Sequence, residues 1–563
     1  MVLSAIANLP TEILLLILQH LSTDDYDILT VGKLCRRLNA VAIPYLLIKK
    51  GLSNPETSSI LNLQDHEEYD NTLVALSLNF SLTKIKHLVF VLDTSSTRTI
   101  HRIHHLISRL SSITSLRLFL RSVGATWSLQ SEFVVGFIDA FVSLLQTVLL
   151  KSCDTLQIVH SNPFPIETNH DFQVMHRRTP FLLWSIAKLA KALNGCLHRG
   201  SPVIDELQGH GWRYQERSIS APTRASAPPL LRWNQSSLST LDINTDFLLV
   251  PPFLIWTVGL LERSKITSLS LSLPRNVTLE EFSHFLFPKI TKVLPLLQEI
   301  KLAFFRDEFL PTVVENLHRL QSLRKITIAL TSFGDLPSAS LAPPMRLLNL
   351  VAFTGSLQQA AYLFACPISC PNLHFLNIVV DFYFRESCDH TADNKLFSIL
   401  RRRLLELHMN PCISVCLVNM DPPSLAPTSK ILDEDNVTES FLIVSRLTLT
   451  LPAFCLDKTE VEHQAVYALA WLNAFRGVQS LTLLARTLDS NNSAREARDL
   501  ALRTSIFAQW PNLKSFDVID LLSDEYHAHW SNFHDDFARG INGIPSITTL
   551  KNKTESPCIC SDF

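Results

Sequence analysis

Residues 9–21 read LPTEILLLILQHL, and this stretch decides the fold of the N-terminal end of the chain. Pro10 suits the first turn of a helix, where a missing N–H is tolerated, and Glu12 complements the positive end of the helix dipole. The residues that follow are apolar on nearly every side. Such a pattern is typical of a helix packed on two sides and not of one that faces water.

Two more short helices are expected directly after the first. The segment STDD at residues 22–25 breaks and caps the chain, and apolar positions recur from Asp27 to Leu34. A third segment runs from Cys35 to an expected stop at Pro44. About fifty residues in three short helices bury little area. A partner that completed the packing could bury several Leu and Ile side chains, each contributing roughly 1.5–3 kcal/mol.

The order and spacing of residues 9–38 resemble an F-box. The resemblance begins at the Leu-Pro pair, continues through the Asp27-Ile28-Leu29 helix and ends at Cys35-Arg36-Arg37. Leu38 departs from the pattern, because many members have Trp or Phe there. Gly32 is a second departure, since glycine weakens a helix by ~1 kcal/mol against alanine. The resemblance implies binding to a Skp-family adaptor and, through it, to a cullin–RING ubiquitin ligase.

Carried over position by position, the resemblance also implies the residues that form the adaptor-binding face or support it directly. These are Leu9, Pro10, Ile13, Ile17, Leu21, Ile28, Leu29, Leu34 and Cys35. The sequence leaves open which of them contact the adaptor and which lie in the core. An ordinary three-helix cap on the domain that follows is the alternative interpretation.

One pattern, apolar-x-x-apolar-x-apolar, recurs along the rest of the chain. Its copies start at Ile113, Leu238, Ile266, Leu297, Leu323, Met345, Leu373, Leu404, Val444, Val478 and Leu513. From Leu238 to Leu404 the starts are 22 to 31 residues apart. Periods of this length indicate stacked supersecondary units. Each copy predicts a short strand whose alternate residues point inward.

Helix-like spacing fills the gaps between these copies. It is seen in Phe133, Phe137, Phe141 and Leu145, and again between Leu279 and Leu294. Stacked strand–helix units resemble leucine-rich repeats, which form a curved solenoid with a parallel sheet on its concave side. The predicted fold class is α/β (α+β): a three-helix F-box, then an irregular leucine-rich-repeat-like solenoid with parallel strands and helices. The alternative is an α/β domain whose strands happen to start alike.

These observations predict a domain organisation. The expected parts are an F-box at residues 1–50, a linker at 51–80, a leucine-rich-repeat-like domain at 81–555 and a tail at 556–563. Within the repeat domain, residues 194–232 and 421–436 are predicted loops, because they lack periodicity and are rich in turn-forming or acidic residues. An F-box with an irregular repeat region is similar to fungal F-box proteins of the basidiomycete type.

Composition disfavours several classes of function. Lys and Arg number 50 against 52 Asp and Glu, so no long-range field attracts nucleic acid. Only 14 residues are Gly, and the chain has neither a phosphate-cradling glycine motif nor a nucleophile-elbow motif. The 11 Cys form no C-x-x-C pair, which disfavours a zinc module or a disulfide framework. We expect no catalytic residue, no metal site and no cofactor.

Apolar runs do not predict membrane insertion or export. No basic residue precedes residues 13–18 and no small-residue cleavage site follows them, so a signal peptide is disfavoured. Residues 247–261 are too short for a span and contain a Pro pair, and residues 133–150 carry Asp139. A cytoplasmic and/or nuclear location is expected.

The resemblance to an F-box thus implies a non-catalytic substrate-recognition subunit of an SCF-type cullin–RING ubiquitin ligase. The F-box would bind a Skp-family adaptor, and the repeat domain would hold a target protein that the sequence does not identify. Ubiquitin transfer would gain from proximity, because a bimolecular step becomes effectively intramolecular. The alternative is an F-box/repeat interaction scaffold without a ubiquitin-ligase role. An enzyme within the repeat region has no motif behind it.

Overall fold

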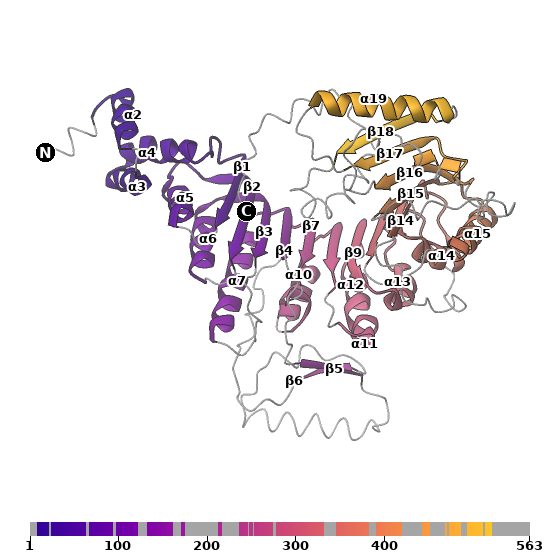
Figure 1. The fold of residues 1–563 in the computed structure, drawn as a ribbon. Coiled ribbons are helices and arrows are strands. Elements are labelled where there is room, and N and C mark those ends of the chain that lie inside the picture. The colour runs from indigo at the N-terminus through magenta and orange to yellow at the C-terminus, as the bar shows by residue number, and fades with distance from the viewer. Residues whose placement is uncertain are drawn as a thin grey trace, which may run out of the picture. The chain divides into compact units, whose positions relative to one another are not determined.

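A computed structural model (Figure 1) gives the structure of much of the chain. It describes residues 8–21, 24–63, 67–93, 97–121, 132–160, 170–174, 212–216, 236–245, 247–251, 253–273, 277–330, 345–381, 390–418, 442–450, 468–469, 472–473, 475–485, 492–510 and 513–520. The chain divides into two compact units. The first comprises residues 1–377 and 399–411, and the second comprises residues 378–398 and 412–563.

Three helices open the first unit, as the sequence predicts. They are α2 (Thr11–His20), α3 (Asp25–Leu34) and α4 (Arg36–Lys49). The carboxylate of Asp24 caps α3 by accepting a hydrogen bond from the backbone N–H of Tyr26 at 2.8 Å. Cys35 is in an extended conformation and separates α3 from α4. The predicted break at residues 22–25 overlaps α3 by one residue, because α3 begins at Asp25.

The predicted stop at Pro44 is wrong, because α4 continues through it to Lys49. A proline inside a helix removes one backbone hydrogen bond and costs about 3 kcal/mol. The turns on both sides of Pro44 carry Ile43, Leu46 and Leu47, which are all buried. Burying three such side chains offsets the cost of the proline, since each contributes roughly 1.5–3 kcal/mol.

A parallel sheet forms the body of the first unit. Its strands, in spatial order, are β1 (Ser58–Leu63), β2 (Lys84–Asp93), β3 (Ser112–Arg121), β4 (Thr155–His160), β7 (Thr240–Asn244), β8 (Ser268–Ser272), β9 (Glu299–Phe305), β10 (Lys325–Leu330), β12 (Ala352–Ser356) and β14 (Phe375–Asp381). Strand β14 begins in this unit and ends in the second. The predicted mixture of parallel strands and helices is confirmed.

Helical segments connect these strands and lie along one side of the sheet (Figure 1). They are α5 (Glu67–Leu78), α6 (Thr97–Arg109), α7 (Glu132–Leu150), η1 (Phe247–Leu249), α10 (Phe253–Arg263), α11 (Leu279–Glu281), η2 (Phe282–Leu286), α12 (Phe287–Val293), η3 (Asp307–Phe309), α13 (Leu310–Leu317) and α14 (Leu357–Ala365). Helix α15 (His390–Glu406) follows β14 in the chain. Helix α15 passes from the second unit into the first. The two helical stretches expected at Phe133 and Leu279 are confirmed.

The core lies between the sheet and these helices. Equivalent apolar residues occupy the same row on neighbouring strands, and all are buried: Leu88, Leu116, Leu156, Leu241, Leu269, Ile300, Ile326 and Phe353. Because side chains alternate between the two faces of a strand, the residues before and after this row point to the opposite face.

Two copies of the repeated pattern, those starting at Met345 and Leu404, do not form the sheet strands that the sequence predicts. Met345 and Arg346 form the short strand β11, which pairs with β13 (Ile368–Ser369), and Leu348 is 48% exposed. The sheet strand starts later, at Ala352. Leu404 lies in α15 and not in a strand. Apolar residues spaced by three also occur on a helix face, so the pattern alone does not separate helix from strand.

The stretches predicted to link or loop contain regular elements. Residues 51–80, expected to be a linker, hold strand β1 and helix α5, and α5 packs on α3 and α4. Strand β6 (Trp212–Glu216) falls inside the predicted loop 194–232 and pairs antiparallel with β5 (His170–Val174). The predicted loop 421–436 and the tail 556–563 lie outside the described residues.

The second unit also contains a parallel sheet. Its strands are β15 (Cys412–Val418), β16 (Val444–Thr450), β17 (Ser480–Ala485) and β18 (Ser515–Asp520), in that order, and helix α19 (Asn492–Gln509) connects the last two. Leu447, Leu481 and Phe516 share one buried row across this sheet. Of all the helices described in either unit, none has the length and apolar character that crossing a membrane requires.

Candidate functional site

Helix α2 is apolar on two opposite faces. Leu14 and Leu18 are buried, and they are four residues apart on the face that packs inward. Ile13, Leu16 and Ile17 are spaced by three and four residues, so they share the other face, where their exposed fractions are 42%, 52% and 38%. We call Ile13, Leu16 and Ile17 the α2 strip. The sequence predicts a helix packed on two sides, and the structure buries one of these apolar faces and leaves the other exposed to solvent.

The structure divides the nine predicted adaptor-binding residues into groups. Pro10, Ile13, Ile17 and Leu34 are exposed. Leu9, Leu21 and Cys35 are half-buried. Ile28 and Leu29 are buried in the core between the helices, so they can support a contact surface but not contact a partner directly. Leu16 is not among the nine predicted residues, although its spacing of three from Ile13 places it on the same exposed face.

A side chain from α4 holds the start of the strip. Nη2 of Arg37 donates a hydrogen bond to the backbone carbonyl oxygen of Leu9, with 2.6 Å between the two atoms. Leu9 directly precedes Pro10, the N-cap residue of α2. This bond ties the Leu-Pro start of α2 to the first turn of α4 across 28 residues of sequence. The motif in the sequence includes Arg37, but it does not predict the hydrogen bond from Arg37 to Leu9.

An ion-pair cluster joins the first turn of α3 to the end of α4. The carboxylate of Asp25 lies 2.9 Å from Nζ of Lys49 and 2.5 Å from Nζ of Lys50. Partial burial pushes the pKa of Asp25 upward, but hydrogen bonds and charge from the two ammonium groups outweigh it, and the pKa is lowered overall. The cluster is partly open to water, so we expect it to contribute little more than a surface pair.

The two departures from the F-box pattern both lie in the helical core. Leu38 is buried and fills the position where many members have an aromatic side chain. Gly32 is buried where α3 approaches α4, and a Cβ added there would lie 2.6 Å from Cδ1 of Ile43. Glycine at this position therefore permits a close approach of the two helices, which explains why a helix-weakening residue is accommodated.

Asn39 connects the three helices to the body of the first unit. Its side chain is almost fully buried, and Nδ2 lies 3.0 Å from the carbonyl oxygen of Gly32 and 3.0 Å from that of Leu78. Gly32 belongs to α3 and Leu78 ends α5. One amide group thus satisfies two carbonyls on two different helices, and a buried polar group with both its donors used rigidifies the packing around it.

Comparison with known families agrees with this geometry. The F-box-like family pattern matches residues 6–49, the region that forms α2, α3 and α4. The N-terminal module is therefore an F-box-like domain, and the chain that carries it is supported as an F-box protein. No curated protein matches the chain. The match ends at residue 49, so the leucine-rich-repeat interpretation of residues 81–555 and the fungal resemblance stay predictions.

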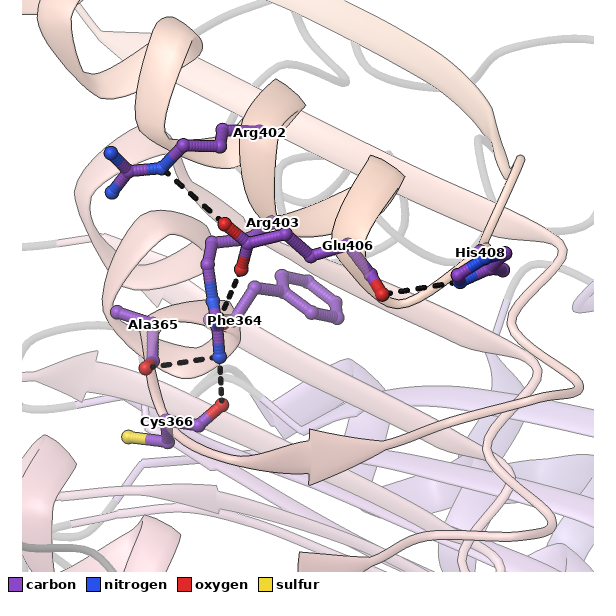
Figure 2. Close-up of polar contacts among 7 residues, drawn as sticks. All are labelled: Phe364, Ala365, Cys366, Arg402, Arg403, Glu406 and His408. Carbon is purple, nitrogen blue, oxygen red and sulfur yellow. Dashed lines mark hydrogen bonds and ion pairs between the residues drawn. The ribbon is translucent and has the colours of Figure 1, made fainter.

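Other polar clusters are structural in character. Figure 2 shows Arg403, in the last turn of α15, whose Nε donates to the carbonyl oxygen of Phe364 at 3.0 Å. Nη2 lies within 3.5 Å of the carbonyl oxygens of Ala365 and Cys366, and Nη1 pairs with Glu406 at 2.5 Å. Arg403 thus caps the C-terminal end of α14. The run Arg401-Arg402-Arg403 is typical of a solvated helix end, but these contacts show that Arg403 is engaged with the protein.

The reactive side chains that the structure describes, such as His104, Cys153 and Cys370, are hydrogen-bonded or buried. Nε2 of His104 lies 2.7 Å from Oγ1 of Thr147, which links α6 to α7. Burial raises the pKa of the Cys153 and Cys370 thiols to about 12, so neither is a thiolate at neutral pH. Within the described ranges, His, Cys, Asp and Glu form no group of three that could hold a metal ion. Three histidines that are close together in the sequence, His527, His529 and His534, lie outside those ranges.

Proposed function

We propose that this chain is the substrate-recognition subunit of an SCF-type cullin–RING ubiquitin ligase. The F-box-like domain would bind a Skp-family adaptor, and the remainder would hold a target protein. The observation that carries the proposal is the α2 strip. Ile13, Leu16 and Ile17 leave an apolar face open on a domain that matches the F-box-like family. Adaptor binding is the function associated with that family.

The adaptor would cover the strip together with the residues around it. Pro10 and Leu34 are exposed, and Leu9, Leu21 and Cys35 are half-buried, so all five could lose further exposed area on binding. The three strip side chains are already about half covered, so completing their burial would contribute about half of the roughly 1.5–3 kcal/mol that full burial of each such side chain gives. Ile28 and Leu29 would act beneath this surface by holding α3 against its neighbours.

Proximity is the mechanism in this proposal. The chain would carry no catalytic residue, and the ubiquitin-conjugating enzyme held by the ligase would do the chemistry. The buried amide of Asn39 and the packing of α5 on α3 and α4 join the F-box-like domain to the sheet of the first unit. A rigid connection supports proximity, because a target held on the body stays at a fixed distance from the adaptor.

The remainder of the chain would be an irregular leucine-rich-repeat-like domain of the kind found in basidiomycete F-box proteins. The parallel strands and their shared buried row support this interpretation. The irregular features are the variable period and the extra pair β11 and β13. The proposed setting is the cytoplasm and/or the nucleus, where cullin–RING ligases act.

Affinity capture of the full chain tests the proposal. We expect a Skp-family adaptor and a cullin to co-purify, and a captured target to gain ubiquitin when the ligase is reconstituted with its conjugating enzyme. Capture of the adaptor without any cullin or ubiquitin transfer would favour the interaction scaffold instead. Failure to capture the adaptor at all would contradict both.

A further inference from the structure

One row of residues crosses the first unit's sheet on the face opposite the buried core. Its members are register partners on five neighbouring strands: Arg117 on β3, Gln157 on β4, Asp242 on β7, Ser270 on β8 and Lys301 on β9. All five are half-buried, so each keeps part of its side chain open. We call these five residues the polar row.

Charge alternates along the polar row at a fixed spacing. Arg117, Asp242 and Lys301 stand on every second strand, and neutral hydrogen-bonding residues separate them. Neighbouring strands lie about 4.8 Å apart, so the Cα atoms of consecutive charged residues are roughly 9.5 Å apart. The row therefore presents positive, negative and positive charge at equal steps across the strands.

Arg117 is the member of the polar row whose surroundings most favour binding an external carboxylate. Its guanidinium stacks on the ring of Phe119, with 4.3 Å between the guanidinium carbon and the ring centroid. Its Nε is buried and has no hydrogen-bond partner among the described residues. Burial lowers the pKa of Arg117, and the charge of Asp242 opposes that shift. Arg117 as a whole is only half-buried, and a partly desolvated cation favours a carboxylate that reaches its open side.

Asp242 is held in place by its neighbour. Nε2 of Gln157 donates to Oδ2 of Asp242, with 2.7 Å between the atoms. A carboxylate positioned in this way favours a cationic side chain. Lys301 completes the series, and Glu299, two residues earlier on the same face, accepts a hydrogen bond from Ser268 at 3.3 Å. Glu299 and Lys325 are register partners in the adjacent row.

We propose that the polar row binds an extended segment of the target protein that carries acidic, basic and acidic side chains at positions i, i+3 and i+6. The segment runs across the strands in the polyproline II conformation. That helix has three residues per turn and rises ~3.1 Å per residue, so i, i+3 and i+6 face one side at steps of ~9.3 Å. This step matches the roughly 9.5 Å between the Cα atoms of the charged residues in the row.

Other backbone conformations fit the row less well. In a β-strand, residues i and i+3 point to opposite faces, so the three charges could not meet the row together. An α-helix rises ~1.5 Å per residue and would need charges about seven residues apart. The inference rests on the proposed function, because it specifies the kind of target segment that the receptor recognises.

Fluorescence anisotropy with synthetic peptides tests this inference on the full chain purified with its adaptor. The matched probe is PPEPPKPPEPP, whose symmetric charge order reads the same in both chain directions. The spacing control, PPPEPKPEPPP, has the same composition with charges two residues apart. We expect the matched probe to bind at least about tenfold more tightly than the control, a difference of ~1.4 kcal/mol.

Charge reversal locates the binding site. Arg117→Glu is expected to weaken binding of the matched probe about tenfold, and a probe with one terminal Glu replaced by Lys should restore it. Lys325→Glu is the matched control, since it makes the same charge change on the adjacent row and should leave binding unchanged. Rescue by PPKPPKPPEPP or by PPEPPKPPKPP, but not by both, would also give the direction of the bound chain.

Several results would overturn the inference. They are no binding of the matched probe up to about 1 mM, equal binding of the two spacings, equal loss in Arg117→Glu and Lys325→Glu, or preference for a helical peptide with charges seven residues apart. Each preparation is also tested for adaptor binding. A chain that keeps its adaptor but ignores the probe refutes this inference alone, whereas a chain that binds no adaptor refutes the proposed function.

Discussion

The guanidinium of Arg37 donates a hydrogen bond to the carbonyl oxygen of Leu9, and this 2.6 Å contact joins the first residues of the F-box-like domain to α4. This hydrogen bond thus connects the Leu-Pro start of α2 to the Arg-Arg end of the F-box motif. Because Leu9 precedes the N-cap residue Pro10, the contact fixes where α2 begins and how the α2 strip is presented.

Removing this contact is expected to weaken adaptor binding more than it weakens folding. Arg37→Ala should lower adaptor affinity about fivefold to tenfold, since a charge-assisted hydrogen bond is worth roughly 1.5–3 kcal/mol and part of that is recovered from water. Calorimetric titration with a Skp-family adaptor measures the affinity, and thermal melting measures stability. Arg36→Ala, which removes an exposed neighbouring arginine, should change neither. Equal losses in both variants would contradict the assigned role.

Alanine at Gly32 should destabilise the protein even though alanine is the better helix former. The added Cβ would lie 2.6 Å from Cδ1 of Ile43, whose side chain is fully buried. Overpacking costs about 1–3 kcal/mol, against a gain of ~1 kcal/mol in helix propensity. Chemical denaturation should therefore show a net loss of roughly 1 kcal/mol in the free energy of unfolding. Ile43→Val removes Cδ1, so the double variant should recover part of that loss.

Asn39 should be required for the F-box-like domain to pack stably on the sheet and helices of the first unit. Asn39→Ala removes the donor shared by the carbonyl oxygens of Gly32 and Leu78. Leaving a buried acceptor unsatisfied costs about 1–3 kcal/mol, so we expect a loss of roughly 2 kcal/mol and faster proteolysis between residues 49 and 67. Asn54→Ala, at an exposed position, is the control. An unchanged cleavage rate in Asn39→Ala would argue against a coupling role.

The Asp25 cluster predicts a weak dependence of stability on acid. The pKa of Asp25 is lower in the folded chain than in the unfolded one, so its contribution is complete above the unfolded pKa of about 3.9. It is lost as the pH falls through the folded pKa. Asp25→Asn should therefore destabilise the protein at pH 7 by no more than about 1 kcal/mol, because water screens the cluster. The difference between the two proteins should shrink towards zero below that pKa in denaturation curves.

Much of the N-terminal domain could be predicted from local sequence. Two apolar faces on one helix are visible in the alternation of Leu14 and Leu18 with Ile13 and Ile17, and helical periodicity requires no knowledge of the remaining chain. The contacts of Asn39 and Arg37 could not be predicted, because they join residues 39 and 28 positions apart in sequence. Such hydrogen bonds depend on the packing of helices that a periodic pattern does not specify.

The same reasoning explains the errors in the repeat region. Leu404 has the spacing of a strand pattern but lies on α15 with Phe397 and Leu400, which are buried on the same helix. Three further copies, starting at Ile85, Cys153 and Cys412, form β2, β4 and β15 and are absent from the sequence prediction. Cys153 is a small buried residue in a position usually held by Leu or Ile, so a wider definition of apolar would have found it.

The polar row illustrates a different limit. Arg117, Asp242 and Lys301 are far apart in sequence, and their order becomes visible only when the strand register is known. A shift of one residue in any strand would move its member to the other face. The charge pattern is therefore a property of the assembled sheet and not of any single segment.

The most direct test of the central claim is adaptor affinity after charge is placed on the α2 strip. Ile13→Glu with Ile17→Glu adds two carboxylates to the exposed apolar face, whereas Thr11→Glu with Gln19→Glu adds two at exposed positions off that face. We predict that the first pair lowers affinity for a Skp-family adaptor by a factor of 100 or more, or about 3 kcal/mol, while the control pair binds normally and both stay folded. Full adaptor affinity in a folded strip variant would contradict the account.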